Sequence, residues 1–108
     1  MGKIIHIVLW KLAPPPSSIT AVADIAAHQA QVKARFQKLL TVPGVLEGYV
    51  GEPKIADRAK GFDWGFYAVF ESMDALKKYA VSDAHMKIVI EDVRPNTQDV
   101  LAYDFELP

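Results

Sequence analysis

The sequence predicts a single α+β domain in which an antiparallel sheet of four strands carries helices on one face. Two observations lead to this prediction. Short segments rich in β-branched and aromatic residues alternate with segments whose apolar residues recur at three- and four-residue intervals, so strands and amphipathic helices both occur. The chain of 108 residues is 51% apolar, which suffices for one compact core. We therefore expect residues 1–108 to form one domain.

The first part of the chain contains a strand, a stiff connection and a long helix. Residues 3–12 are apolar and β-branched without a turn residue, which predicts a strand. The prolines at 14–16 predict an extended surface connection, because proline lacks a backbone donor and favours an extended chain. Apolar residues at helical spacing over 18–40 predict one amphipathic helix, and Ser18 or Thr20 is available to cap its first turn.

Two strands follow the Pro-Gly pair at 43–44, which ends this helix. Residues 45–50 form the first of these strands, and the aromatic-rich segment 62–70 forms the second. The charged segment 54–61 between them is a polar loop.

Two shorter helices and a last strand complete the chain. Ser72 is a predicted N-cap for a helix over 73–79, and Ser82 repeats this signal for a second helix. That second helix must stop near Arg94, because the next residue is proline. Residues 100–105 form the last strand. The resulting order, β-α-β-β-α-α-β, matches the ferredoxin-like arrangement, in which the strands lie side by side in the order fourth, first, third, second.

Both faces of this sheet carry apolar side chains. In the strand at 62–70, Phe66 and Phe70 point to one face, and Tyr67 and Val69 point to the other. One layer of helices covers only one face, and monomers seldom expose an apolar patch larger than roughly 300–600 Å². We therefore expect a homodimer whose two sheets face each other and form a dimeric α+β barrel. The alternative is a monomer with a well-buried sheet.

The composition excludes several classes of function. The chain has 12 basic and 13 acidic residues, and its longest basic run is the pair at 77–78, so neither nucleic acid nor an anionic membrane is an expected partner. It contains no cysteine, which excludes disulfides, thiolate catalysis and cysteine-based metal sites. No phosphate-binding glycine loop or serine-nucleophile motif occurs. We expect a cytoplasmic protein without a membrane span and without a cofactor.

The three histidines are the first candidates for proton transfer, since imidazole titrates near neutral pH. His6 interrupts an apolar strand, and Asp104 lies in the predicted neighbouring strand, so the two form either a catalytic pair or a structural one. His85 lies beside an apolar helix stripe in the first turn of its helix, which favours neutral imidazole; the alternative is a surface residue. His28 is predicted to lie on the surface. Neither His6 nor His85 has metal-ligand spacing, so no metal site is predicted.

Aromatic side chains are the candidates for ligand contacts. Tyr79 shares a helix face with apolar residues, which suits either a catalytic hydroxyl or a ring packed inward. Five further aromatic residues either line an apolar ligand cavity or simply form the core: Trp10, Phe36, Trp64, Phe66 and Phe70.

Four segments, in order over nearly the whole chain, resemble the stress-responsive A/B barrel family, also called Dabb. They are the opening strand at 4–12, the Phe-Glu-Ser junction at 70–72, the segment from Tyr79 to His85, and the closing Tyr-Asp-Phe at 103–105. The resemblance implies a dimeric α+β barrel. Family members include plant stress-induced proteins without an assigned reaction and polyketide cyclases of the olivetolic acid cyclase type, which close a ring by an aldol reaction.

By this resemblance, Tyr79 and His85 correspond to the cyclase's catalytic tyrosine and histidine. His6 and Asp104 correspond to the family's histidine in the first strand and carboxylate in the last. The chain departs from the cyclase at Trp64, where the cyclase has a pocket histidine, so a differently shaped pocket is expected. In the implied reaction, His85 removes a carbon-bound proton between two carbonyls, and Tyr79 donates to the enolate oxygen.

Three functions therefore stay open, because the fold alone does not choose among them. The first is a small cofactor-free enzyme, similar to a polyketide cyclase or lyase, that acts on a hydrophobic or aromatic carbonyl substrate by histidine-assisted proton abstraction. The second is a non-catalytic stress-responsive barrel that binds a small apolar ligand. The third is a cofactor-independent monooxygenase, which oxygen consumption would distinguish from the first.

Overall fold

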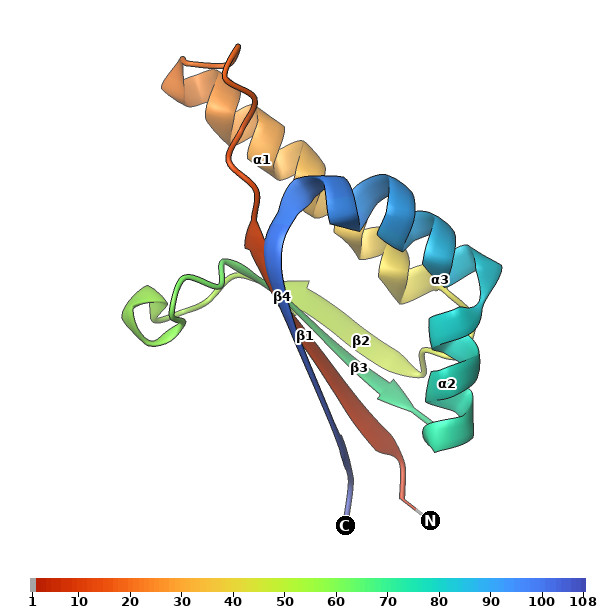
Figure 1. The fold of residues 1–108 in the computed structure, drawn as a ribbon. Helices are drawn as coiled ribbons and strands as arrows, with labels where there is room; N and C mark the ends of the chain where they lie inside the picture. Colours follow the sequence, from red (N-terminus) through yellow and green to blue (C-terminus); the bar gives the residue numbers. More distant parts are fainter. Residues whose placement is uncertain (1) are drawn as a thin grey trace.

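A computed structural model describes residues 2–108 and shows strands and helices in the predicted order (Figure 1). The main elements are β1 (Ile4–Leu12), α1 (Val22–Phe36), β2 (Glu47–Gly51), β3 (Trp64–Phe70), α2 (Met73–Val81), α3 (Asp83–Ile88) and β4 (Thr97–Glu106).

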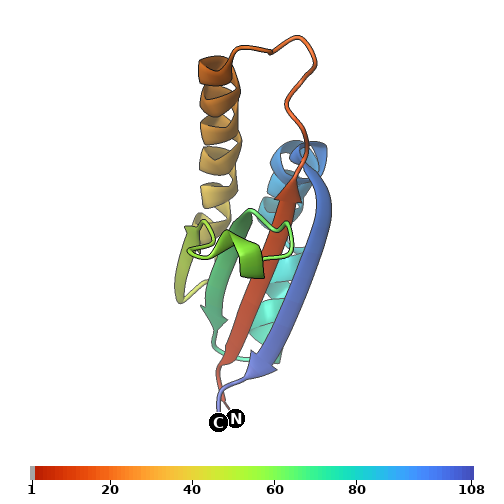
Figure 2. The ribbon, with the colours of Figure 1, turned by 90° about the vertical axis from the view of Figure 1, so that its left-hand side faces the viewer.

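The strands form one antiparallel sheet in the order β2-β3-β1-β4, as predicted. The helices lie on one face of this sheet, and the termini lie together at one end of it (Figures 1 and 2). The register pairs His6 of β1 with Ala68 of β3 on one side and with Asp104 of β4 on the other. The α+β ferredoxin-like prediction is therefore confirmed.

The predicted serine caps start both short helices. The Ser72 hydroxyl accepts a hydrogen bond from the backbone N–H of Ala75 at 3.1 Å, and the Ser82 hydroxyl accepts one from that of His85 at 3.2 Å. Beyond α3 the chain continues as a π-helical turn, Val89–Val93, and a 3-10 turn, Arg94–Asn96. The helical path thus ends where the proline predicts, but its last turns are not α-helical.

The long first helix is shorter than predicted. It begins at Val22 and ends at Phe36, and a 3-10 turn over Gln37–Thr41 replaces its last part. Neither Ser18 nor Thr20 caps it, because the extended residue before its first turn is an alanine and makes no side-chain cap. Its first half extends past the end of the sheet (Figure 2), so the apolar positions there have no partner, and the Val22 side chain is 85% exposed.

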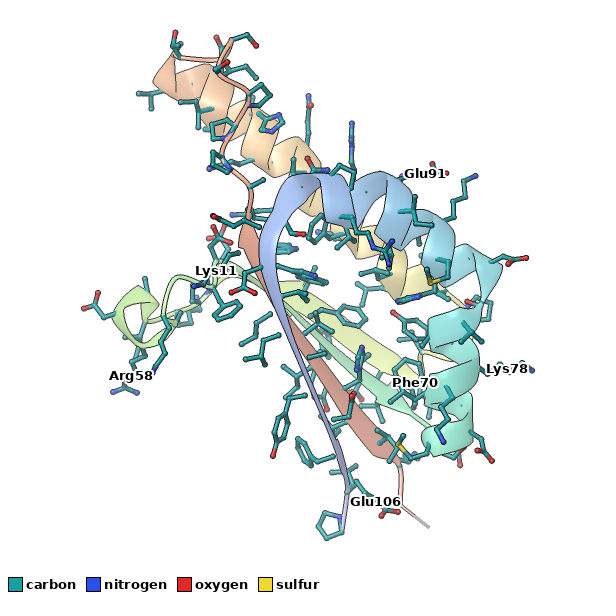
Figure 3. The ribbon with its side chains drawn as sticks, in the orientation of Figure 1. Lys11, Arg58, Phe70, Lys78, Glu91 and Glu106 are labelled. Atoms are coloured by element: carbon teal, nitrogen blue, oxygen red, sulfur yellow. The ribbon has the colours of Figure 1, made fainter. Side chains whose placement is uncertain are left out.

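The core lies between the sheet and the helices. Its largest fully buried side chains are Phe36, Phe66 and Phe70, and Phe70 lies between the sheet and α2 (Figure 3). The Trp10 ring meets the Phe36 ring edge-to-face, with 4.8 Å between ring centroids. These contacts fix the helices over the even-numbered residues of β1 and β3.

The opposite face of the sheet is apolar and carries no α-helix, and the β2–β3 loop, with its short 3-10 turn Ala56–Arg58, lies over part of it (Figure 2). Tyr49 of β2 and Tyr103 of β4 are 65% and 62% exposed there, and Leu101 and Phe105 lie along the same face of β4. The prediction that both faces carry apolar side chains is therefore confirmed, and helices cover one of them.

Candidate functional site

A cavity of about 340 Å³ lies between the β1–β4 half of the sheet and the layer formed by α2, α3 and the π-helical turn. This volume lies in the usual range for small-molecule sites, roughly 300–1,000 Å³. Apolar side chains dominate the lining, and the polar residues are two histidines, a tyrosine, an arginine and a threonine. The lining consists of His6, Val8, Trp10, Leu39, Phe66, Tyr79, His85, Val89, Val93, Arg94, Thr97, Val100 and Ala102.

His85 enters this cavity from the first turn of α3, where the Ser82 cap fixes its backbone. Its Nδ1 lies 2.9 Å from the carbonyl oxygen of Ala80. A carbonyl oxygen only accepts, so Nδ1 carries the proton and Nε2 keeps a free lone pair. Burial lowers the pKa of His85, and the nearby His6 also lowers it, against the opposing effect of the Ala80 hydrogen bond. His85 is therefore a neutral imidazole whose Nε2 can accept a proton.

Tyr79 lies on α2 beside His85, with 4.5 Å between the two ring centroids. The residue is only 3% exposed, and its ring also contacts Phe70 at 4.7 Å between centroids. Burial raises the pKa of the Tyr79 hydroxyl, so this group stays protonated at working pH. No side-chain hydrogen bond within residues 2–108 involves the Tyr79 hydroxyl, and Tyr79 lines the cavity. Tyr79 can therefore donate to a ligand.

His6 and Asp104 meet across β1 and β4. The Nδ1 atom of His6 donates to the Oδ1 atom of Asp104. The His6 side chain is 13% exposed and that of Asp104 is 36% exposed, so the carboxylate lies at the solvent side of the pair. The His6 ring packs edge-to-face against Phe66 and Tyr79, at 5.9 and 6.2 Å between centroids. Asp104 thus fixes the orientation of a second imidazole whose Nε2 is free.

The structure brings most of the predicted site residues together. Three candidate catalytic residues line the cavity, namely His6, Tyr79 and His85, and so do two of the aromatic candidates, Trp10 and Phe66. Asp104 does not line the cavity but accepts the hydrogen bond from His6. Three aromatic candidates lie elsewhere. Phe36 and Phe70 are fully buried in the core and do not line the cavity, and Trp64 lines a separate recess beside the β2–β3 loop.

His28 is half-buried on α1 and does not line the cavity either. Its flank position on the amphipathic helix predicts a place outside the core.

The residues of the helix-to-β4 connection line the cavity although the sequence did not predict them as site residues. Val89 and Val93 of the π-helical turn, together with Arg94 and Thr97, line the cavity. The available signal was the proline after Arg94, which marks an irregular helix end, and π turns recur at functional sites.

The described residues offer neither a metal-binding cluster nor a membrane-spanning helix. Residues 2–108 contain no group of three or more His, Cys, Asp or Glu side chains placed to hold a metal ion. Within the same residues, no helix combines the length and the apolar character that crossing a membrane requires.

A family model described as the stress responsive A/B barrel domain, Dabb, matches residues 4–107. The chain belongs to the Dabb family. The family expectation drawn from the sequence is therefore confirmed. No curated protein matches this chain.

Solved structures share the Dabb fold at low sequence identity. A Dabb family protein from Mesorhizobium loti superposes with a TM-score of 0.74 at 21% identity, covering 100% of this chain and 98% of that one. Hydroxynitrile lyase from Passiflora edulis gives 0.75 at 17% identity, with 99% and 94% covered. SnoaB, a cofactor-independent oxygenase from Streptomyces nogalater, gives 0.67 at 12% identity, with 100% and 95% covered.

Some structural neighbours are described as dimeric. Ferredoxin-like proteins of unknown function from Thermobifida fusca and Jannaschia sp. are described in this way, at TM-scores of 0.71 and 0.67 and 20% identity each. The first match covers 98% of this chain and 92% of that one, and the second covers 98% and 100%.

Proposed function

We propose that the cavity is the active site of a small cofactor-free enzyme that removes a carbon-bound proton from a hydrophobic or aromatic carbonyl compound, in the manner of a polyketide cyclase. The observation that carries this proposal is the pairing of His85 and Tyr79 on one wall of an apolar cavity. The first offers a basic Nε2 and the second a protonated hydroxyl, which are the two groups that enolate formation needs.

The step conserves atoms and electrons without an oxidant or reductant. His85 Nε2 takes the proton from a carbon between two carbonyls, and the bonding electrons form an enolate whose oxygen accepts a hydrogen bond from Tyr79. The enolate carbon then attacks a second carbonyl carbon of the same molecule, which forms the new C–C bond. The oxygen of that carbonyl takes the proton back from His85, which regenerates the base.

His6 and Asp104 support the opposite side of the substrate in this proposal. Asp104 accepts the Nδ1 proton of His6, so His6 Nε2 can accept a hydrogen bond from an enol or hydroxyl of the substrate. Trp10 and Phe66, which line the same cavity, contact its apolar part.

Two alternatives use the same cavity. The fold accommodates cofactor-free oxygenation, since SnoaB shares it. A barrel that binds an apolar ligand without turnover is supported by the predominance of apolar lining residues. Oxygen uptake during turnover would favour the first alternative, and binding without product would favour the second.

The proposal is tested by incubating the protein with a panel of poly-β-ketone thioesters and analysing the products by mass spectrometry. Wild type is expected to release a cyclised product, and His85→Gln is expected to lower kcat about 10²- to 10⁴-fold, the usual contribution of one proton-transfer group. His28→Gln is the matched control, because His28 does not line the cavity. Unchanged turnover in folded His85→Gln would remove His85 as the base.

The pH profile provides a second readout for His85. The rate requires neutral imidazole, so it falls as the pH drops through the pKa of His85. Because burial lowers that pKa, the fall is expected below the ordinary histidine value of about 6.5. A rate that already falls above that value would contradict this assignment.

We also propose that the chain forms a homodimer with the two sheets facing each other. The exposed apolar face of β4 and β2, which no α-helix covers, supports this arrangement, as do the neighbours described as dimeric.

A further inference from the structure

Arg94 is the single permanently charged residue among the lining residues of the cavity. No aspartate or glutamate lines it. The nearby carboxylates have other partners: Asp92 pairs with Lys38 at 3.3 Å, and Asp104 accepts from His6. Within residues 2–108, no ion pair or side-chain hydrogen bond involves the Arg94 guanidinium. The cavity lining therefore includes one residue of permanent positive charge that has no ion-pair partner among the described residues.

The backbone that carries Arg94 is fixed on both sides. The Asn96 side chain donates to the Asp92 carbonyl at 2.7 Å, and the Thr97 hydroxyl donates to the Val93 carbonyl at 3.0 Å. The Ala13 N–H donates to the Asn96 carbonyl at 2.8 Å, which ties this turn to the end of β1. Arg94 itself is exposed. A rigid turn thus holds a solvated cation at the edge of an apolar cavity.

We propose that Arg94 selects ligands that carry a carboxylate, with the apolar body of the ligand in the cavity and its acid group on the guanidinium. A guanidinium forms two parallel hydrogen bonds to a carboxylate, a geometry that lysine does not reproduce. A neutral ligand offers the guanidinium no charge to pair with. A phosphate dianion fits less well, because the cavity lining contains no lysine and no second arginine to pair with its second charge.

This inference rests on the proposed function and narrows its substrate class. The substrate would be an apolar or aromatic carbonyl compound with an acid group at one end. Arg94 would hold that end, and His85 and Tyr79 would act on the carbonyl portion. Arg94 is therefore a specificity-determining residue and not the base.

The test measures binding of three matched probes by titration calorimetry: 2-naphthoate, 2-naphthamide and 2-naphthyl phosphate. Wild type is expected to bind the carboxylate about 10- to 100-fold more tightly than the amide, the range for a hydrogen bond to a charged group. Arg94→Gln is expected to abolish this preference, and Arg94→Lys to keep part of it. Arg58→Gln is the control, because Arg58 lies on the β2–β3 loop away from α2 and α3 (Figure 3) and does not line the cavity.

The outcomes separate this inference from the proposed function. Equal affinity of wild type for acid and amide, or a preference that survives in Arg94→Gln, would overturn the role of Arg94 and leave the cavity as a ligand site. Tighter binding of the phosphate than of the carboxylate would overturn the choice of acid group. A carboxylate preference that depends on Arg94, without turnover of any carbonyl substrate, would support Arg94 and overturn the proposed catalysis. Failure of all three probes to bind would overturn the role of Arg94, while turnover of the poly-β-ketone panel tests the proposed catalysis separately.

Discussion

Replacing Tyr79 by phenylalanine separates a catalytic hydroxyl from a structural one. The residue is 3% exposed, and its ring packs on Phe70 and His85 at 4.7 and 4.5 Å between centroids. Phenylalanine keeps these ring contacts and removes only the oxygen. Because no hydrogen bond among the described residues 2–108 involves that oxygen, its removal leaves no polar group unpaired.

The expected magnitudes for activity and stability therefore differ. Removing one donor to a developing oxyanion costs about 10²- to 10³-fold in kcat, or about 2.7–4 kcal/mol of transition-state stabilisation. The free energy of unfolding should change by less than about 0.5 kcal/mol, which is below the loss of roughly 0.5–1.5 kcal/mol that accompanies a broken hydrogen bond. A structural tyrosine would show the reverse pattern.

The assay compares kcat on the best substrate of the poly-β-ketone panel with urea unfolding at fixed protein concentration. Tyr49→Phe is the control, since it removes the same hydroxyl on the opposite face of the sheet, away from the cavity, and keeps the ring that this face offers to a second copy. Because burial raises the pKa of Tyr79, the wild-type rate should not fall between about pH 8 and 10 through loss of this donor, as an ordinary tyrosine with a pKa near 10 would begin to show. Unchanged kcat in Tyr79→Phe, or a large loss of stability, would refute the reasoning.

Three other changes test the pair, the core and the open sheet face. In Asp104→Ala, nitrogen NMR should show His6 shifting from the Nδ1-protonated to the Nε2-protonated tautomer, since the acceptor of the Nδ1 proton is gone; an unchanged tautomer would contradict the pair. Phe70→Ala should lower the free energy of unfolding by about 3–5 kcal/mol in urea melts, because the side chain is fully buried, and a loss below about 1 kcal/mol would show that the site collapses or was loosely packed. Tyr103→Asp should give a monomer in sedimentation, because the dimer would bury the new charge between two sheets. Val81→Asp, on the exposed side of α2, is the control and should leave the dimer intact. A wild type that sediments as a 12.0 kDa species would overturn the dimer.

Local patterns in the sequence determined the fold and part of the site. Aromatic-rich composition and serine caps act within a few residues, so they predict β3 and the starts of α2 and α3 correctly. Strand order follows from the element order, and it places Asp104 beside His6, two polar residues in apolar runs that must satisfy each other. The pairing of Tyr79 with His85 was an expectation from the family resemblance, and the two rings lie 4.5 Å apart between centroids.

Only the tertiary structure decided which apolar residues face a cavity and which fill the core. Phe36 and Phe66 are equally apolar in the sequence and both are fully buried in the fold, but only Phe66 also lines the cavity. The packing of α1 could not be predicted from its sequence either, because its apolar stripe continues past the point where the sheet ends and has nothing to pack against there. Arg94 directly follows the π-helical turn Val89–Val93 and lines the cavity. The extra residue of a π turn rotates the side chains that follow it, and no local periodicity of the sequence encodes that rotation. Cavities depend on contacts between residues that are distant in the chain, whereas hydrophobic patterning indicates only that burial of a side chain is favourable, not where it is buried.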